Sequence, residues 1–496
     1  MPEITKNNNA ALLTNLGIET SDVGLDDGSV LASLRVVRYV PGRRCVCHAI
    51  WHGRGVYAKL FFGHNAERNA LRDVAGVNHL QNATILTPEI LKQSEIKRLG
   101  IYVVIFEEIV SSENAEAVWV HSSESARLTL AKQLTQIVSA HHEAGLLQTD
   151  LHLKNFLVKK EKIYSIDGDG VREFGMLANK QALDNLSRLL SKFDVLMLEK
   201  HLSELLACYA EARQWATPPK VEAVKANIDA ARYKATVSYA DKKVFRQCTD
   251  VNIYKKKNIF IATSSTHPTV DLPQVDAQFD GYFTPENIIK NGNTCTVALV
   301  TINGVRIAIK RYNIKNFWHG ISRALRQTRA AVSWANAHRL KLLALETAHP
   351  IGLIEIRRFG LKGKAYFLAE TIDAPDMVTF FKQSSDKVLR ARAVKELVQL
   401  FYRLHLLNIS HGDMKATNIK VLADGSPALI DLDSMRQHRI DFLAQRAHVR
   451  DIKRFMQNWK DEPSLYNAFV KVFKVVYVDH APLQAAHILN NHIELT

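Results

Sequence analysis

The chain has 496 residues, 47% hydrophobic and 23% charged, a composition that is typical of a folded protein and excludes a mainly disordered one. No apolar run approaches the roughly 18 residues of a membrane span, the start is too polar for a signal peptide, and five irregularly spaced cysteines fit reduced thiols, so we expect a soluble cytoplasmic protein. The net charge of +15 comes mainly from residues 251–496, where 34 Lys and Arg accompany 21 Asp and Glu, which favours an anionic partner.

A first series of elements is predicted after an N-terminal extension, residues 1–28. Alternating apolar residues predict strands, and apolar residues three and four positions apart predict helices. In chain order, the predicted elements are strands at 33–40, 45–51 and 55–60, a helix at 65–74, a strand at 101–106 and a long helix at 125–144.

A second series follows in the same order. Its predicted elements are strands at 294–301 and 304–310, a helix at 323–345, a strand at 365–369 and a long helix at 386–407. Residues 235–275, with three consecutive lysines and a stretch that contains Ser, Thr and Pro, are predicted to be a linker. Strands followed by helices, twice, predict the α+β class.

A motif of Asp, Asn and Ile-Asp-x-Asp occurs once in each series. The matching residues lie 263 or 264 positions apart: Asp150 and Asp413, Asn155 and Asn418, Asp167 and Asp431. Upstream, a strand that ends at a lysine also repeats, at Lys59 and Lys310. The sequence therefore predicts a tandem of two related modules.

These residue types fit phosphoryl transfer from ATP. That reaction needs a cation at the phosphates, oxygen ligands for Mg²⁺ and a base that orients the acceptor hydroxyl. A strand lysine, an Asp and an Asn five positions apart, and a later Asp supply these groups in that order. Each motif alone is common in turns or on strand edges, but their ordered occurrence, twice, favours this chemistry.

The two motifs also carry a family resemblance. The segments QTDLHLKN…SIDGD and HGDMKATN…LIDLD resemble the catalytic and metal-binding loops of protein-kinase-like small-molecule kinases. Within that superfamily, KRYNIKNFWHGISRALRQTRAAVSWANAHRL, HGDMKATNIKV and LIDLDSMR are most similar to bacterial lipopolysaccharide core kinases, which phosphorylate heptose or Kdo sugars. The resemblance covers about residues 30–200 and 280–460. It implies two tandem bilobal modules, 29–234 and 276–496, each with a small β-rich N-lobe and a larger helical C-lobe.

The resemblance implies a role for each matching residue. Lys59 and Lys310 would contact the phosphates of ATP, and Glu67 would orient Lys59. Asp150 and Asp413 would be the catalytic bases. The Mg²⁺ ligands would be Asn155, Asp167, Asn418 and Asp431.

Each module departs from the family pattern. In the first, Gln148 stands where a histidine is usual before the catalytic Asp. In the second, the helix position aligned with Glu67 is Asn336, so Lys310 needs another counter-charge or is held less firmly. The turns expected to cover the nucleotide, residues 41–44 and 291–294, contain few glycines.

The stretch 317–345 is basic and aromatic. Arg323, Arg326 and Arg329 recur every three residues and so share a broad helical face, which suits anionic lipid headgroups or an anionic glycolipid. A solvated helix face is the alternative. Nucleic acid is not expected, because the sequence carries no signature of a fold that binds it.

The sequence thus predicts a kinase that uses ATP and Mg²⁺ to phosphorylate a sugar of the lipopolysaccharide inner core, cytoplasmic and peripheral at the inner membrane. One alternative is a non-catalytic pseudokinase pair that binds nucleotide or glycolipid as a scaffold. The other is a kinase for a different small hydroxyl substrate, such as an aminoglycoside.

Overall fold

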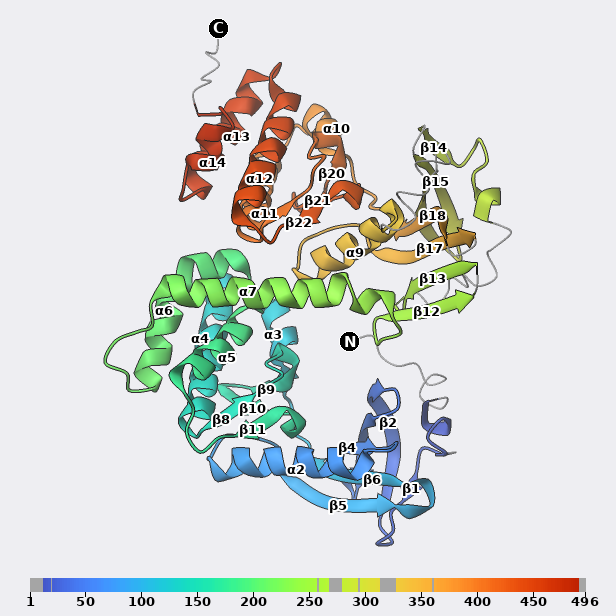
Figure 1. The fold of residues 1–496 in the computed structure, drawn as a ribbon, viewed down its shortest axis with the longest axis vertical. Coiled ribbons are helices and arrows are strands. Elements are labelled where there is room, and N and C mark those ends of the chain that lie inside the picture. Colours follow the sequence, from blue (N-terminus) through green and yellow to red (C-terminus); the bar gives the residue numbers. More distant parts are fainter. Residues whose placement is uncertain are drawn as a thin grey trace. The chain divides into compact units, whose positions relative to one another are not determined.

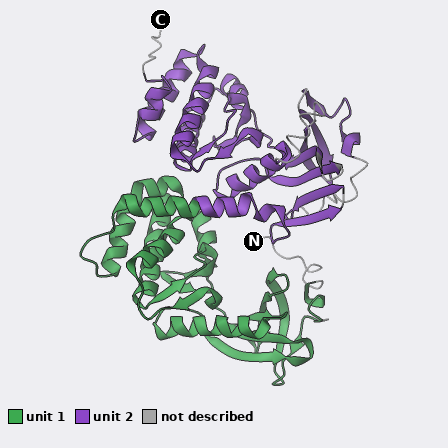
Figure 2. Ribbon diagram, viewed as in Figure 1, with its two compact units in different colours: residues 1–232 green, residues 233–496 purple. Residues whose placement is uncertain are grey.

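The computed structural model describes residues 12–18, 20–256, 258–266, 279–292, 295–312, 327–358 and 361–489. The chain divides into two compact units, which we call unit 1 (residues 1–232) and unit 2 (residues 233–496) (Figure 2). In each unit a mainly antiparallel sheet comes first in the chain and a largely helical part follows (Figure 1).

Unit 1 begins with six strands in the order β1-β2-β3-β4-β6-β5. They are β1 (Val23–Gly24), β2 (Val30–Val40), β3 (Arg44–Trp51), β4 (Arg54–Phe61), β5 (Ile90–Ile96) and β6 (Ile101–Glu107). In β4, Val56, Ala58 and Leu60 are fully buried on one face. Side chains alternate along a strand, so Lys59 lies on the opposite face of the sheet.

Helix α2 (Ala66–Asn82) covers the face of the sheet that bears Lys59. Its buried positions include Ala66, Ala70, Asp73 and Val77, spaced three and four residues apart, which is the spacing of one helix face. The apolar members of this face pack against β4 and β6. The same face carries Asp73, which the packing therefore brings toward the sheet.

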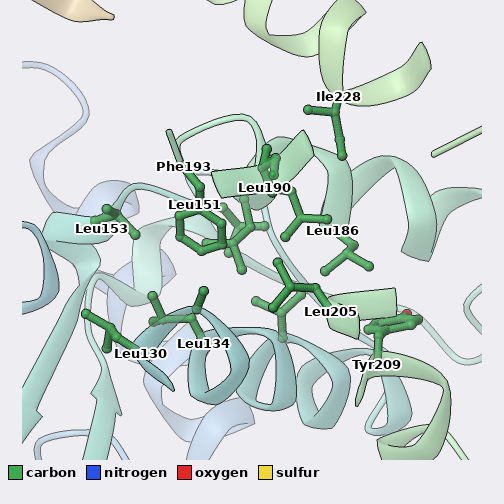
Figure 3. Packing of buried hydrophobic residues seen from close by; sticks show 14 of the residues in the cluster. Leu130, Leu134, Leu151, Leu153, Leu186, Leu190, Phe193, Leu205, Tyr209 and Ile228 are labelled. Carbon is green, nitrogen blue, oxygen red and sulfur yellow. The ribbon is translucent and has the colours of Figure 1, made fainter. Parts of the chain in front are cut away.

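The helical part of unit 1 encloses its own apolar core (Figure 3). Its helices are α3 (Ala115–His121), α4 (Glu124–Glu143), α5 (Asn179–Leu190) and α6 (Val195–Ala212), and its short strands are β7 (Glu113–Asn114), β8 (Leu146–Gln148), β9 (Phe156–Lys159), β10 (Lys162–Ser165) and β11 (Val171–Glu173). A further helix, α7 (Val221–Ala240), begins in unit 1 and ends in unit 2. Leu151 and Leu153, which lie within the predicted catalytic loop, pack into this core with Leu130 and Leu134 of α4.

The large sheet of unit 2 has seven strands in the order β12-β13-β17-β18-β16-β15-β14. They are β12 (Val251–Lys256), β13 (Ile259–Ser264), β14 (Ile288–Asn291), β15 (Cys295–Ile302), β16 (Val305–Tyr312), β17 (Pro350–Arg358) and β18 (Leu361–Glu370). The segment predicted as a linker, residues 235–275, therefore contributes to the fold of unit 2. Its polar and lysine-rich composition suits β12, an edge strand, while β13 pairs on both sides and is largely buried.

The helical part of unit 2 has an aromatic core. Its elements are α10 (Met377–Gln383), α11 (Lys387–Leu406), α12 (Asp441–Met456), α13 (Pro463–Val476) and α14 (Ala481–Ala485), with short strands β19 (Ile409–Ser410), β20 (Ile419–Val421), β21 (Pro427–Leu429) and β22 (Arg436–Gln437). Phe401 of α11, Phe455 of α12 and Phe469 and Phe473 of α13 are fully buried and their rings are in contact. One further helix, α9 (Arg329–Leu342), packs against β17 and β18 of the sheet.

The long helices predicted at 125–144 and 386–407 are confirmed as α4 and α11, and the two strands predicted to carry a lysine are confirmed as β4 and β16. Of the helix predicted at 323–345, residues 329–342 are confirmed as α9, and residues 323–326 lie outside the described residues. None of the helices in the described parts of the chain combines the length and hydrophobicity that a membrane crossing requires.

Candidate active site

The loops that contain Asp150 and Asp413 share the same local hydrogen bonds. In unit 1, the Asn155 side-chain amide donates to the carbonyl oxygen of Asp150 at 2.9 Å. In unit 2, the Asn418 side-chain amide donates to the carbonyl oxygen of Asp413, also at 2.9 Å. The five-residue spacing thus closes a compact loop in both places, as the sequence predicts.

Alternate residues anchor each loop to the interior. Leu151 and Leu153 are buried in unit 1, and Met414 and Ala416 occupy the corresponding buried positions in unit 2. The side chains between them are directed away from the core, and Asp150 itself is exposed. Apolar residues at every second position therefore hold the backbone while the polar ones stay available for chemistry.

A backbone hydrogen bond ties each loop to the predicted metal-binding Asp. The amide of Ile166 donates to the carbonyl oxygen of Asn155 at 2.9 Å, and the amide of Ile430 donates to that of Asn418 at 3.0 Å. Asp167 and Asp431 follow directly, and both adopt the left-handed conformation, with φ of 72° and 63°. Each unit therefore brings its Asn and its second Asp to one place.

The residue two positions before each predicted catalytic Asp makes the same contact in both units, although its type differs. The Gln148 side chain donates to the carbonyl oxygen of Ile166 at 3.1 Å, and His411 Nε2 lies 3.0 Å from the carbonyl oxygen of Ile430. Burial lowers the pKa of His411, which keeps its ring neutral near pH 7. An amide therefore replaces the usual imidazole at this contact in unit 1.

Asp451 of α12 binds the backbone just before Asp413 in unit 2, and sequence reasoning missed this residue. Its carboxylate accepts the backbone N–H groups of His411 at 2.7 Å and of Gly412 at 3.0 Å. Burial raises its pKa to about 6, although the two N–H groups act in the opposite direction. In unit 1 the Asn185 side chain donates to the carbonyl oxygen of Gln148 at 3.0 Å. The sequence offers no local signal for Asp451, because the contact spans about 40 residues.

Lys310 of β16 lies between two carboxylates. Its ammonium group donates to Asp431 and, at 3.1 Å, to Asp433. Burial by itself would lower the pKa of Lys310, but the negative charges around it outweigh burial and raise the pKa above its usual range. These two aspartates are the counter-charge that Lys310 was predicted to need in the absence of a helix carboxylate.

Helix α9 supplies a cation and an amide to the same loop. Arg329 pairs with the buried carboxylate of Asp433 at 2.8 Å. The Asn336 side chain donates to the carbonyl oxygens of Leu432 at 2.9 Å and Met435 at 2.8 Å. Asn336 thus positions the backbone that follows Asp431 and does not act as a counter-charge for Lys310.

Asp413 has cations close to its carboxylate. Arg454 of α12 pairs with one carboxylate oxygen, and Lys415 lies 3.4 Å from the other. The Asn418 side chain also donates to that carboxylate at 3.1 Å. Although partial burial acts to raise the pKa of Asp413, Lys415 and Arg454 hold it below its usual range.

In unit 1, Lys59 pairs with Asp73 and not with Glu67 as predicted. The ammonium group lies 2.8 Å and 2.9 Å from the two carboxylate oxygens of Asp73, which is fully buried, and 3.6 Å from Asp167. Glu67 is exposed. The reason is helix phase: Asp73 shares the buried face of α2, whereas Glu67, six residues earlier, lies on a different face.

Arginines dominate the rest of this site, and sequence reasoning did not find them. Arg44, the first residue of β3, donates from both terminal nitrogens to the two carboxylate oxygens of Asp167, at 2.9 Å and 3.0 Å. Arg43 and Arg72 both pair with Asp169. The one available signal is the Arg43-Arg44 pair in the turn that was expected to cover the nucleotide.

The described part of the basic stretch 317–345 is engaged within unit 2. Trp334 is fully buried and its indole N–H donates to the carbonyl oxygen of Val244 at 3.0 Å. Arg339 is buried and pairs with Asp241, and Arg329 pairs with Asp433. Three further members of the stretch lie outside the described residues: Trp318, Arg323 and Arg326. Of the helical face predicted for the three arginines, only Arg329 lies within the described residues; it pairs with Asp433, and 41% of its side chain is exposed.

Other predicted features lie partly outside the described residues. Asn293 and Thr294, in the second of the predicted nucleotide-covering turns, are not described. Across the described ranges, no group of three or more His, Cys, Asp and Glu side chains is arranged to hold a metal ion. The donor set predicted for each unit is smaller, one Asn and one Asp.

Comparison with families of known proteins gives a match within unit 2. No curated protein matches the chain. A family match begins before β14 and ends after α14, so it includes Lys310, Asp413, Asn418 and Asp431. Residues 284–489 match the lipopolysaccharide kinase (Kdo/WaaP) family.

Proposed function

We propose that the protein transfers the γ-phosphoryl group of ATP to a sugar hydroxyl, of heptose or Kdo, in the lipopolysaccharide inner core, and that unit 2 carries out this reaction. The observation that supports it is the junction of two groups within residues 284–489: the loop of Asp413 and Asn418, and the Lys310–Asp431 pair. Phosphoryl transfer requires a base, oxygen ligands for a metal and a phosphate-binding cation in one site.

Asp413 is the base in this proposal. It would orient the acceptor hydroxyl and take up its proton while the hydroxyl oxygen bonds to the γ-phosphorus and the bond to ADP breaks. Because its pKa lies below the usual range, Asp413 is ionised at neutral pH and can accept that proton. Lys310, on the adjacent sheet, would contact the phosphates of ATP.

Asn418 and Asp431 are the residues of unit 2 that would hold Mg²⁺. Both offer oxygen donors, which Mg²⁺ prefers, and usually it keeps waters and substrate phosphates as its other ligands. Within the described residues, the carboxylate of Asp431 forms its ion pair with Lys310, and 22% of its side-chain surface is exposed. A bound Mg²⁺ would neutralise charge on the phosphates during transfer.

The surroundings of Asp413 support an anionic acceptor. Arg454 and Lys415 both lie beside the base, where the acceptor hydroxyl would sit. Two cations there would attract an acidic glycolipid and repel a cationic acceptor such as an aminoglycoside. This favours the lipopolysaccharide core over the alternative substrate class.

A lipid-linked acceptor implies work at the cytoplasmic face of the inner membrane, and we retain peripheral membrane contact as part of the proposal. Its support is the basic charge of residues 251–496. We do not count Arg329 among the residues that would contact the membrane, because it pairs with Asp433.

The test is phosphate transfer from Mg-ATP to dephosphorylated core lipopolysaccharide by the purified full chain. Asp413→Asn keeps the shape of the side chain but cannot accept the proton, and we expect it to lower transfer by at least about 100-fold. The control is Asp441→Asn, an exposed aspartate at the start of α12. Asp150→Asn, assayed in parallel, separates the contribution of unit 1.

The outcomes distinguish the proposal from its alternatives. Transfer by the wild type that is lost in Asp413→Asn and kept in Asp441→Asn supports it. Wild-type transfer that survives in Asp413→Asn contradicts the base assignment. No transfer by the wild type, with nucleotide binding intact, would favour the non-catalytic pair or a different acceptor.

A further inference from the structure

The two units differ at the carboxylate that is predicted to bind metal. In unit 1, both oxygens of Asp167 accept hydrogen bonds from the two terminal nitrogens of Arg44. Both side chains are largely buried, with 8% and 13% of their surfaces exposed. An arginine side chain keeps its positive charge at any physiological pH. The forked geometry uses the carboxylate as a bidentate acceptor.

Such a pairing is incompatible with a metal on the same carboxylate. Mg²⁺ binds carboxylate oxygens directly at about 2.0–2.1 Å and demands near-ideal octahedral geometry. Because Arg44 engages both oxygens of Asp167, the metal would have to share an oxygen with a guanidinium nitrogen, and the repulsion between the two cations is strong in a poorly solvated place, whereas Lys310 engages one oxygen of Asp431. Displacing Arg44 instead would leave a buried guanidinium without its partner, which is costly.

The strand register identifies the residue of unit 2 that corresponds to Arg44. In unit 1, Arg44 lies opposite Phe61, two residues after Lys59 on β4. In unit 2, Cys295 lies opposite Tyr312, two residues after Lys310 on β16. The position that holds a guanidinium in unit 1 thus holds a small neutral thiol in unit 2.

The carboxylates reflect this difference. Asp431 has 22% of its side-chain surface exposed, against 13% for Asp167. Among the described residues, Asp431 forms an ion pair with Lys310 and with no arginine, whereas Asp167 is paired with both Arg44 and Lys59. The two loops share the backbone bond between Ile and Asn and the bond between the Asn side chain and the Asp carbonyl.

We propose that unit 1 takes up no Mg²⁺, because Arg44 occupies the place of the metal, and that metal binding and phosphoryl transfer belong to unit 2 alone. This rests on the function proposed above for unit 2. Unit 1 then keeps the loop geometry of a phosphotransferase without its metal.

The first test counts metal ions without any turnover. Mn²⁺ replaces Mg²⁺, and electron paramagnetic resonance gives the number bound per full-length chain in the presence of a non-hydrolysable ATP analogue. We expect one ion per chain in the wild type, none in Asp431→Asn and one in Asp167→Asn. Two ions in the wild type, or a loss caused by Asp167→Asn, would overturn the proposal.

A reciprocal exchange tests whether Arg44 is the cause. Arg44→Cys gives unit 1 the residue of unit 2, and we expect two ions per chain. Cys295→Arg gives unit 2 the residue of unit 1, and we expect none. Circular dichroism and the melting temperature establish that both variants are folded. A folded Arg44→Cys variant that still binds one ion contradicts the proposal, and so does a folded Cys295→Arg variant that keeps its ion.

Failure of the proposed function gives a different result. If unit 2 is not a metal-dependent phosphotransferase, the wild type binds no ion, and Asp431→Asn changes nothing. A count of two ions, by contrast, leaves the function of unit 2 intact and refutes only the assignment of unit 1.

Discussion

Asp451→Asn tests how the loop of unit 2 that contains Asp413 is held in place. Asp451 accepts two backbone N–H groups, from His411 and Gly412, and the isosteric amide keeps one acceptor oxygen but presents an NH₂ group to the other N–H. A buried N–H group without a partner costs about 1–3 kcal/mol. The variant should therefore loosen the loop locally.

A second effect has the opposite sign. The pKa of Asp451 rises from 3.8 to about 6, so the ionised carboxylate is less stable in the fold by about 3 kcal/mol at neutral pH. Removing that charge offsets the lost hydrogen bond. We expect the free energy of unfolding of unit 2 to change by less than about 2 kcal/mol at pH 7, while the amides of His411 and Gly412 lose about 10- to 100-fold of their protection from hydrogen exchange.

The pH dependence separates the two effects. Since the folded pKa of Asp451 lies above the unfolded value, its protonation stabilises the fold below about pH 4, and this contribution is lost as the pH rises to about 6. Asp451→Asn should lack this change. The assay is hydrogen–deuterium exchange of peptides that cover residues 408–414, between pH 4 and 7, with the exposed Asp461→Asn as control. Equal protection of this segment in Asp451→Asn and wild type would refute the reasoning.

Two more predictions concern the cores of the units. Trp334→Phe removes the indole N–H that bonds to the carbonyl oxygen of Val244 and part of a fully buried side chain, so unit 2 should lose about 1–3 kcal/mol of stability in urea denaturation; an unchanged midpoint would contradict this. Burial lowers the pKa of His141 to about 3, so unit 1 should lose stability as the pH falls below about 6.5. His141→Gln should flatten this acid dependence in thermal melts, and a slope as steep as in the wild type would count against it.

Most of the predictions made from the sequence came from the motif that occurs in both halves of the chain. The order lysine, Asp, Asn and Asp can be seen directly in the sequence. The structure brings Lys310, Asp431 and the Asn418 loop together in unit 2. The two strand lysines were found because strand alternation is visible in the sequence. Local patterns of this kind require no knowledge of tertiary packing.

The partners that complete the site were not predictable in the same way. Asp73, Arg44 and Asp451 act across long stretches of chain, and their roles depend on helix phase and strand register. Glu67 was chosen as a carboxylate near the start of a helix, but the buried face of α2 selects Asp73. The basic stretch read as a surface proved partly internal, because Arg329 and Arg339 find buried or half-buried carboxylate partners.

Asp167 and Asp431 both adopt a left-handed backbone conformation that destabilises the fold, so each aspartate must be kept for another reason. This conformation costs a residue with a side chain about 1–2 kcal/mol, and glycine adopts it freely. Selection for stability alone would favour glycine at position 431, where Lys310 would retain Asp433 as a partner. At position 167 glycine would remove both hydrogen bonds of the buried Arg44 and leave it the more distant carboxylate of Asp169, at 3.9 Å, so there the aspartate also serves the fold. The same strained aspartate would thus be kept for its proposed function in unit 2 and for its ion pair with Arg44 in unit 1.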